Sequence, residues 1–406
     1  MRLLYVSCFL FQKKQNETFA LPSCSDGFFE KYVFNAAIQE FEKKRSELQD
    51  SVHVLGEAPH EYLDTNSFVQ MKNPRITVSN LPANTHPKDF KNDSAVRKAL
   101  RDEIEKADAV LIKPATRKGI MAIKIAERLK KPYMIEMTGD IHNALKQNPS
   151  ILKRMYAPIL YSKIKRAIKN APYGLYVSKD YLQSQFPING KMCGCSDVVL
   201  LKSDASVLEN RFRRIETQSE REYVELSLIG FYQGLMKGVD TAIRALSRLP
   251  KNYRLHILGN GTEENRKKWL EYGEKLGVTD RIFFPKPLPS SEAVLHWLDT
   301  VDVFVLPTRS EGFGRCVAEA MSRGCPCFAT DICTMPELLP RECLHPLGDD
   351  SALAEQILKV MSDPEEAKKY ASVNFEKAKE YDFDVLKQRR DLFLADFKKY
   401  CEEVKQ

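Results

Sequence analysis

Short apolar runs alternate with longer amphipathic stretches along most of the chain. In the first half the apolar runs cover residues 2–7, 51–56, 75–80, 109–114, 133–140 and 174–179. In the second half they cover residues 224–230, 254–259, 281–285, 302–307 and 325–331. Strands that alternate with segments of helical length predict parallel sheets with helices on both faces. The pattern therefore predicts an α/β fold with two similar domains that face each other across a cleft.

The length of 406 residues is sufficient for two domains, since chains beyond roughly 250 to 300 residues usually divide. Residues 202–222 are polar and charged, and we interpret this segment as the connection between the domains. We expect the first domain over residues 1–205 and the second over residues 206–385. Residues 386–406 belong to a last helix, from about Phe383 to Val404, which we expect to pack back on the first domain.

Charge and cysteine content add only weak constraints. The 62 Lys and Arg against 55 Asp and Glu give a net charge of +7, which suits a polyanionic or membrane-surface partner without requiring one. The apolar run at the N-terminus is too short to span a bilayer and lacks a small-residue cleavage site, so a first strand is favoured over a signal peptide. The ten cysteines form no CxxC pair, so we expect no metal site and reduced thiols in the cytoplasm.

The segment EGFGRCVAE places Glu311 and Glu319 on either side of a loop that enters a helix. Ligands of open α/β sheets bind beyond the carboxyl ends of the strands, and this loop follows the run 302–307. Gly312, Phe313 and Gly314 stand at the start of the helix, where glycines let an anion such as a diphosphate approach backbone N–H groups.

The two glutamates have different expected roles. Glu311, on the loop, can reach what lies ahead of the helix, whereas Glu319 can accept hydrogen bonds from a diol such as ribose. An alternative for Glu319 is a surface ion pair with Arg315 or Arg323, which lie four residues to either side.

A second candidate anion site is the pair Lys237-Gly238, which follows the run 224–230 and begins a predicted helix. A lysine at a helix N-terminus opposes the helix dipole, so its placement favours a role in holding an anion. The alternative is a solvated lysine on a surface turn.

Five segments of the second half occur in an order typical of one enzyme family: LIGFYQGLMKGVDTAIRAL, RLHILGNGTEE, LGVTDRIFFPKPLPSSEAV, VDVFVLPTRSEGFGRCVAEAM and GCPCFATDICTMPELL. On these segments the chain resembles the family 4 retaining glycosyltransferases. The resemblance implies the GT-B fold, in which two Rossmann-like domains face each other across a cleft. It also implies an N-terminal domain on the acceptor side, a C-terminal domain that binds a nucleotide-sugar donor, and no cofactor besides the donor.

The resemblance implies roles for the residues of the two motifs. Lys237 would contact the donor diphosphate, Glu311 the sugar, the segment Gly312–Gly314 would offer backbone amides, and Glu319 would hold the ribose. Transfer would build negative charge on the leaving diphosphate, which Lys237 and the helix N–H groups would stabilise without a metal. In this family the acceptor hydroxyl enters from the side of the leaving group, so a dedicated base is not required.

Other positions match the family less closely. The loop from Pro285 to Pro287, with Lys286 at its centre, falls where the family's backbone meets the nucleobase. Phe231 replaces the arginine that usually assists the lysine, which removes a positive charge. Thr138 replaces a histidine near the sugar and could hydrogen-bond a sugar hydroxyl, while His142 is close enough in sequence to swing in. The first loop, over residues 8–32, is long and is expected to shape the acceptor side.

The sequence thus predicts a cytoplasmic, retaining, metal-independent glycosyltransferase that moves a sugar to a saccharide or lipid-linked acceptor, in cell-surface polysaccharide biosynthesis. The alternative is a catalytically degenerate partner or scaffold subunit of the same fold. Residues 151–171 carry six Lys or Arg and no acid, among apolar residues. They predict either peripheral contact with an anionic membrane or a core helix with a solvated basic side. No recognisable motif indicates nucleic-acid binding.

Overall fold

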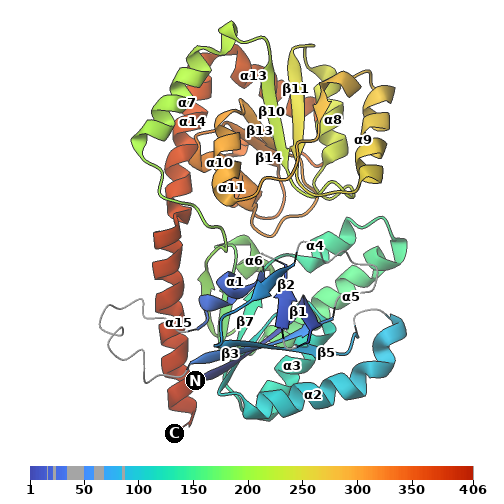
Figure 1. Cartoon of the computed structure of the whole chain (residues 1–406), viewed down its shortest axis with the longest axis vertical. Helices are drawn as coiled ribbons and strands as arrows, with labels where there is room; N and C mark the ends of the chain where they lie inside the picture. Colours follow the sequence, from blue (N-terminus) through green and yellow to red (C-terminus); the bar gives the residue numbers. More distant parts are fainter. Residues whose placement is uncertain (16, 22–23, 34–49, 59–67, 85–86, 406) are drawn as a thin grey trace.

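The computed structural model describes residues 1–15, 17–21, 24–33, 50–58, 68–84 and 87–405. The chain forms two α/β domains that follow one another along the long axis of the molecule (Figure 1). The C-terminal helix α15 (Phe383–Lys405) leaves the second domain and runs alongside the first. The expectation of an α/β fold with two Rossmann-like domains is confirmed.

In the described part of the first domain, the central sheet has nine strands. Its parallel strands lie in the order β5-β3-β1-β6-β7-β8-β9, so the chain starts at the middle of the sheet and builds outward in both directions. These strands are β1 (Arg2–Lys14), β3 (Ser51–Glu57), β5 (Ile76–Leu81), β6 (Ala109–Ile112), β7 (Tyr133–Met137), β8 (Tyr173–Tyr176) and β9 (Lys191–Gly194).

We predicted a long loop over residues 8–32, after the first strand. This prediction is wrong for the first part of the segment. β1 continues to Lys14 and pairs antiparallel with β2 (Glu17–Ala20), which pairs in turn with β4 (Val69–Met71). The physical reason lies in the residues after Ser7, where β-prone aromatic residues continue the strand and Phe11 is fully buried. The hairpin extends the sheet beyond its parallel core.

The helices of the first domain cover the sheet and supply short connections. They are α1 (Asp26–Glu30), α2 (Asp93–Lys106), α3 (Arg117–Arg128), α4 (Ile141–Lys146), α5 (Ile151–Ile168) and α6 (Tyr181–Gln185). α2 shows how they attach, because it buries Val96, Leu100 and Ile104, which lie on one face at helical spacing.

The sheet of the second domain is parallel throughout, in the order β12-β11-β10-β13-β14-β15. Its strands are β10 (Val224–Ile229), β11 (Tyr253–Leu258), β12 (Ile282–Phe283), β13 (Val303–Leu306), β14 (Cys327–Thr330) and β15 (Leu344–His345). Its helices are α7 (Ala205–Glu216), α8 (Val239–Arg248), α9 (Glu263–Lys275), α10 (Ser291–Asp299), α11 (Arg315–Ser322), α12 (Met335–Leu338), α13 (Asp350–Ser362) and α14 (Pro364–Ala378). The order reverses between β10 and β13, where such sheets bind ligands.

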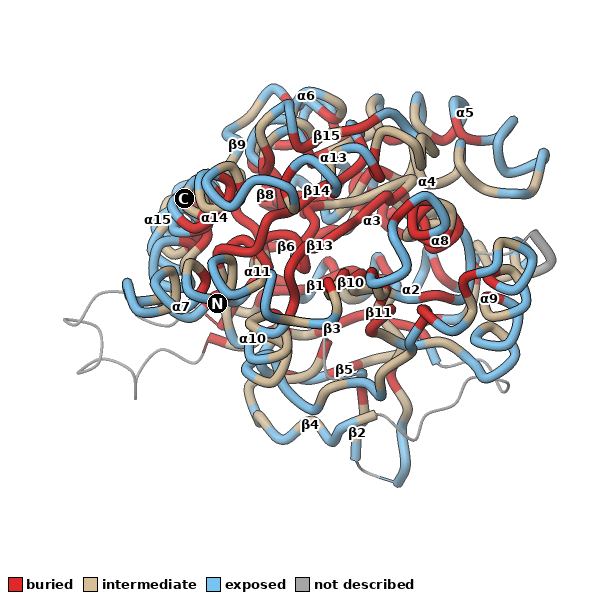
Figure 2. The backbone as a smooth tube through the Cα atoms, turned by 90° about the horizontal axis from the view of Figure 1, so that it is seen from above, coloured by how far each residue is buried: buried red, intermediate tan, exposed pale blue. Residues whose placement is uncertain are grey.

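The cores follow from the continuous apolar strands. Every residue of β6, β7, β13 and β14 is buried, as expected for parallel strands that are covered on both faces. Figure 2 shows the buried backbone in the middle of the molecule and the exposed backbone on the outer helices. No helix among the described residues is long and apolar enough to cross a membrane.

The segment expected to connect the domains is largely a helix of the second domain. Arg211 in α7 is only 3% exposed. Its guanidinium donates to the backbone carbonyls of Leu298, Val301 and Arg323, which satisfies the buried charge. The chain therefore crosses between the domains before α7, and the polar composition of residues 202–222 reflects the outer face of a packed helix.

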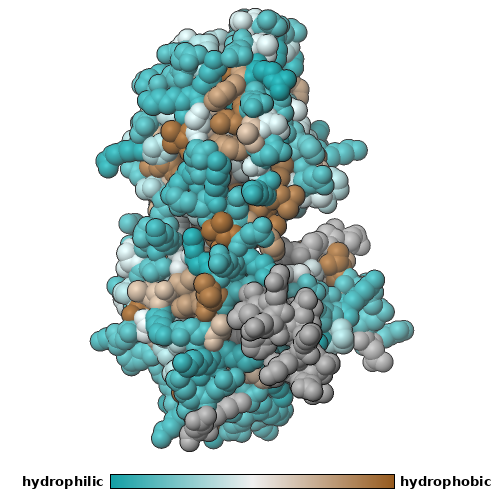
Figure 3. Space-filling view, turned by 90° about the vertical axis from the view of Figure 1, so that its left-hand side faces the viewer, coloured by the Kyte–Doolittle hydropathy of each residue, from teal (hydrophilic) through white to brown (hydrophobic). Residues whose placement is uncertain are grey.

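The last helix returns to the first domain. In α15, Asp396 accepts hydrogen bonds from Tyr173 and Lys191, and Lys398 forms an ion pair with Asp50. The face of the molecule drawn in Figure 3 is mostly hydrophilic, with apolar side chains visible at the level where the domains meet. α15 thus ties the two domains together from one side.

Candidate functional site

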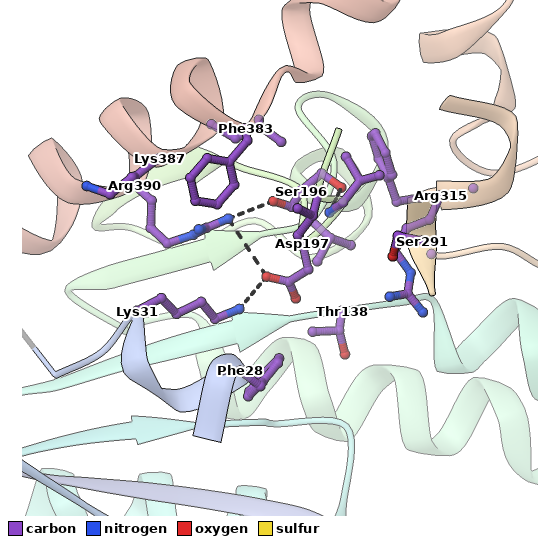
Figure 4. Close-up of a pocket in the computed structure, with 18 of the residues that line it drawn as sticks. Phe28, Lys31, Thr138, Ser196, Asp197, Ser291, Arg315, Phe383, Lys387 and Arg390 are labelled. Carbon is purple, nitrogen blue, oxygen red and sulfur yellow. Dashed lines mark hydrogen bonds and ion pairs between the residues drawn. The ribbon is translucent and has the colours of Figure 1, made fainter. Parts of the chain in front are cut away.

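A cavity of about 910 Å³ lies between the two domains. The ends of β6 and β7 and the segment after β9 open on it, as expected for the carboxyl edge of a parallel sheet. The loop before α11 closes it from the second domain, and α15 provides a third wall (Figure 4). The lining includes Phe9, Phe28, Lys31, Lys113, Thr138, Asp197, Glu311, Gly312, Phe313, Gly314, Arg315, Lys387 and Arg390.

Lys237 and Glu311, predicted as site residues from separate motifs, form an ion pair. The Nζ atom of Lys237 lies 2.5 Å from Oε2 of Glu311. The stem of Lys237 passes over Gly230, where an added Cβ would lie 2.8 Å from Cγ of the lysine. Burial alone would lower the pKa of Lys237, but the Glu311 carboxylate outweighs burial and the net shift is upward. Lys237 therefore stays charged beside the loop that enters α11.

The glycine loop before α11 lies where the two domains touch. An added Cβ on Gly312 would be 2.3 Å from the carbonyl oxygen of Thr138 in the first domain. Gly314 begins the helix in the left-handed region, with φ of 92°, which a residue with a side chain rarely adopts. The ring of Phe313 packs edge-on against Tyr381 with centroids 5.0 Å apart and anchors the loop. The loop is thus shaped by close contacts that exclude larger residues.

Glu319 lies in the second turn of α11, and burial raises its pKa to about 7. Arg323 donates to Asp299 at 2.7 and 2.8 Å, so the ion-pair alternative between Arg323 and Glu319 is wrong. Among the described residues, Arg315 forms no ion pair with Glu319, and its positive charge lowers the pKa of Glu319 by less than burial raises it. Within the described chain, the Glu319 carboxylate has no ion pair or side-chain hydrogen bond.

Cys316, in the first turn of α11, lies near the charged residues predicted for the site. Its thiol is buried, which raises its pKa to about 12, and the charges of Lys237, Glu311 and Glu319 all act on it. The three charged residues are therefore close enough to the start of α11 for their charges to act on Cys316. Their arrangement can hold an anion at the lysine and hydrogen-bond donors at two carboxylates.

Thr138 lines the cavity opposite the glycine loop, at the end of β7. Its side chain is exposed, and Figure 4 shows it on the floor of the cavity. His142 does not join it, because its ring stacks on Tyr161 with centroids 4.7 Å apart, and it is not among the residues that line the cavity. The structure therefore brings Thr138, but not His142, to the cleft.

Direct hydrogen bonds hold the domains together beside the cavity. The side-chain amide of Asn143 donates to the carbonyl oxygen of Arg309 at 2.9 Å. The carboxylate of Glu337 accepts from the backbone N–H groups of Lys179 and Tyr181 at 2.9 and 2.5 Å. The contact between Gly312 and Thr138 is thus part of a polar interface.

Lys286 lies apart from the Lys237–Glu311 pair. It is exposed on the loop after β12 and is not among the residues that line the cavity between the domains. The same loop borders a second, shallower depression of about 560 Å³, whose lining includes Phe283, Phe284 and Pro285. Phe231 is 62% exposed, so the position that lacks the family's arginine faces solvent.

The sequence prediction missed a cluster of charged residues on the first-domain side of the cavity. Asp197 pairs with Lys31, which directly follows α1, and lies 3.9 Å from Nη2 of Arg390 in α15 (Figure 4). Burial would raise the pKa of Asp197, but Lys31 and Arg390 outweigh it and lower the pKa. Lys113 follows β6 and lies 3.6 Å from the buried Glu136.

Only one member of this cluster carried a sequence signal. Lys113 lies near the end of the apolar run 109–114, where it marks the carboxyl end of a strand. Lys31 and Arg390 belong to opposite ends of the chain, and nothing local in the sequence indicates that they meet at Asp197.

Comparison with known proteins places these features in a known class. Residues 218–376 match the family glycosyl transferases group 1. Protein CapJ of Staphylococcus aureus is 25% identical over 98% of this chain and 96% of its own length. The O-antigen biosynthesis glycosyltransferase WclY of Escherichia coli is 35% identical, over 27% of this chain and 29% of its own.

Solved structures share the fold over the whole chain. Sucrose-phosphate synthase from Thermosynechococcus elongatus has a TM-score of 0.65 at 15% identity, covering 97% of this chain and 99% of its own. Anabaena HepE in complex with UDP-glucose has a TM-score of 0.64 at 15% identity, covering 98% of this chain and all of its own.

Two α/β domains whose parallel strands point their carboxyl ends toward a shared cavity define the GT-B fold. Within that fold, residues 218–376 match the family glycosyl transferases group 1, and this match covers the described second domain from just before β10 to within α14.

Proposed function

We propose that the protein is a retaining glycosyltransferase of family 4 that moves a sugar from a nucleotide-sugar donor to a saccharide or lipid-linked acceptor. The observation that carries the proposal is the Lys237–Glu311 ion pair, with Nζ and Oε2 2.5 Å apart, whose glutamate lines the cavity between the domains. Anabaena HepE, which shares the fold, was solved with UDP-glucose, and this supports a nucleotide-sugar donor.

In this proposal the second domain binds the donor. Lys237 and the backbone N–H groups of Gly312–Gly314 contact the diphosphate, Glu311 contacts the sugar and Glu319 accepts hydrogen bonds from the ribose. The raised pKa of Glu319, about 7, supports this role, because a buried carboxylate without a protein partner gains most from donors on a ligand. Lys286 is proposed to lie beside the nucleobase.

The proposed transfer breaks the bond between the anomeric carbon and the leaving phosphate oxygen. The acceptor hydroxyl forms its new bond to the same carbon from the same face, which retains the configuration, and a phosphate oxygen takes the hydroxyl proton. Negative charge that builds on the diphosphate is stabilised by Lys237 and the helix amides, so neither a metal nor another cofactor is required.

The first domain is proposed to bind the acceptor, with Thr138 close to the transferred sugar. Named relatives act in O-antigen and lipopolysaccharide synthesis: WclY, and the lipopolysaccharide 1,6-galactosyltransferase of Escherichia coli, which is 32% identical over 25% of this chain and 28% of its own. They support a role in cell-surface polysaccharide synthesis. A cytoplasmic enzyme in peripheral contact with the inner face of the membrane could reach a lipid-linked acceptor.

The test begins with thermal unfolding of the full chain in a panel of nucleoside diphosphates. A ligand at 100 times its Kd should add about 2.7 kcal/mol to the free energy of unfolding. Nucleotide sugars with the same base should then be hydrolysed or transferred, and the activity should survive EDTA. Binding without any turnover would favour the degenerate partner subunit, and loss in EDTA that Mg²⁺ restores would contradict the metal-free mechanism.

A further inference from the structure

Helix α5 exposes a stripe of large apolar side chains. Ile151, Leu152, Met155, Tyr156 and Ile159 are 64%, 79%, 68%, 39% and 52% exposed. At helical spacing Ile151, Met155 and Ile159 fall in one row, and Leu152 and Tyr156 fall in the row beside it. An exposed patch of this kind marks a site of interaction with a protein or a membrane. We call these five residues the α5 stripe.

The stripe does not contribute to the domain's core. Ala157, Leu160, Ile164 and Ile168 are buried, and they lie on the opposite side of the helix at the same helical spacing. α5 is therefore apolar on two faces, and among the described residues only one of these faces packs against the rest of the protein. Figures 1 and 2 both show the first half of α5 projecting from the body of the first domain.

Positive charge surrounds the stripe. Residues 151–171 contain six Lys or Arg and no Asp or Glu. Lys163 continues the row of Leu152 and Tyr156, with its Nζ 5.9 Å from the centre of the Tyr156 ring. Arg166 lies two turns beyond Ile159 on the same side and is exposed. Apolar side chains flanked by cations match the boundary between the acyl chains and anionic headgroups of a bilayer.

We propose that the α5 stripe is a docking surface for a bilayer that contains anionic lipid, with Leu152 and Met155 inserted among the acyl chains and Lys163 and Arg166 at the phosphate level. A second copy of the chain fits this surface less well, because a two-fold contact would bring two sets of six cations together. The proposal names the surface behind the peripheral contact suggested above, and it does not depend on nucleotide binding or transfer.

The experiment uses the full chain and vesicles of phosphatidylcholine with and without phosphatidylglycerol. We expect the protein to float with vesicles that contain phosphatidylglycerol, and high salt to weaken this binding. Leu152→Ser combined with Met155→Ser should weaken it about 100-fold, because each large apolar side chain removed from water contributes roughly a factor of ten. Lys163→Gln combined with Arg166→Gln should weaken binding to the vesicles that contain phosphatidylglycerol and should not change binding to vesicles of phosphatidylcholine alone.

The matched control is Leu392→Ser on α15, since Leu392 is 66% exposed but lies outside the stripe. It should bind vesicles as the wild type does, and all variants should keep the same unfolding temperature. A Leu152→Trp variant should shift its fluorescence to shorter wavelength when anionic vesicles are added, which confirms insertion directly.

Two results would overturn the proposal. The first is wild-type protein that does not float with anionic vesicles, or a serine double variant that floats equally well. The second is a stable dimer in light scattering that the serine variant dissociates, because the stripe would then be an interface between copies. Neither result would affect stabilisation by nucleoside diphosphates, so failure of the docking surface is distinguishable from failure of the proposed function.

Discussion

Lys237 and Glu311 are 74 residues apart in sequence, yet Nζ of the lysine lies 2.5 Å from Oε2 of the glutamate. Each residue follows a strand, β10 or β13, and these two strands are neighbours in the sheet. The pair keeps the ammonium charged and fixed before any ligand arrives. A diphosphate that binds here exchanges one anionic partner of Lys237 for another, so the lysine need not be desolvated again.

Lys237→Ala should weaken the binding of the cognate nucleoside diphosphate about 10- to 100-fold, because one charge-assisted contact contributes roughly 1.5 to 3 kcal/mol. Calorimetry with the purified variant measures this directly. Lys251→Ala is a suitable control, since Lys251 is exposed in the turn before β11. Equal affinity in wild type and Lys237→Ala would remove the lysine from the diphosphate site.

Glu319 makes the stability of the ligand-free protein depend on pH. Its pKa is raised from 4.5 to about 7, so the folded protein keeps a proton that the unfolded chain has already lost over this interval. The contribution of Glu319 to the free energy of unfolding is therefore most favourable at low pH, and it declines as pH rises from about 4.5 to 7.

Glu319→Gln removes this dependence because an amide does not titrate. The free energy of unfolding of the variant, relative to wild type, should rise through the same interval and reach roughly 1 to 3 kcal/mol above pH 7. Urea unfolding at several pH values provides the measurement. A difference between the two proteins that stays constant with pH would mean that burial does not perturb Glu319.

Gly312→Ala tests the contact between the domains. The new Cβ would lie 2.3 Å from the carbonyl oxygen of Thr138, so the domains must separate to accommodate it. We expect turnover to fall about tenfold or more, since small misplacements of reacting groups are costly, while nucleotide affinity changes little. Gly139→Ala is the matched control, because its Cβ would lie 3.8 Å from Cα of Gly312, an ordinary contact. Small-angle scattering should show expansion for Gly312→Ala alone.

Much of the fold could be predicted from the sequence because its strands are apolar and continuous. The runs at residues 109–114 and 302–307 became β6 and β13, which are buried at every position. The β1–β2 hairpin was missed because its pairing depends on a partner strand beyond a turn. α7 was read as a linker because its outer face is polar, although Arg211 is buried.

The residues of the candidate site also divide into those that the sequence predicted and those that it did not. Lys237 and Glu311 follow neighbouring strands of the second sheet, and Thr138 follows a strand of the first, so the rule for parallel sheets places each of them at a carboxyl edge. Lys31, at the end of α1, and Arg390, in α15, reach the cavity because these helices pack there, and that packing is decided by tertiary contacts that have no local signature. Lys286 also depends on a loop, and the structure separates it from the cavity that holds Glu311.

Glu311→Gln and Glu319→Gln should differ in kinetics, because the two carboxylates are proposed to act on different parts of the donor. Glu311 lines the cavity between the domains, next to the expected position of the sugar. Glu311→Gln should therefore lower kcat, by roughly 100-fold, while nucleoside diphosphate affinity stays unchanged or tightens as Lys237 loses its competing partner.

Glu319 lies one helical turn past Cys316 and is proposed to hold the ribose in ground and transition states alike. Glu319→Gln should raise the donor KM and weaken the nucleoside diphosphate by a similar factor, with a smaller effect on kcat. Binding to the wild type should also release a proton near pH 7, because ribose hydroxyls favour the ionised carboxylate whose pKa is about 7 in the free protein. Calorimetry in buffers of different ionisation enthalpy detects this proton, and Glu319→Gln should abolish it. Equal kinetic profiles for the two variants, or proton release that survives in Glu319→Gln, would contradict this division of roles.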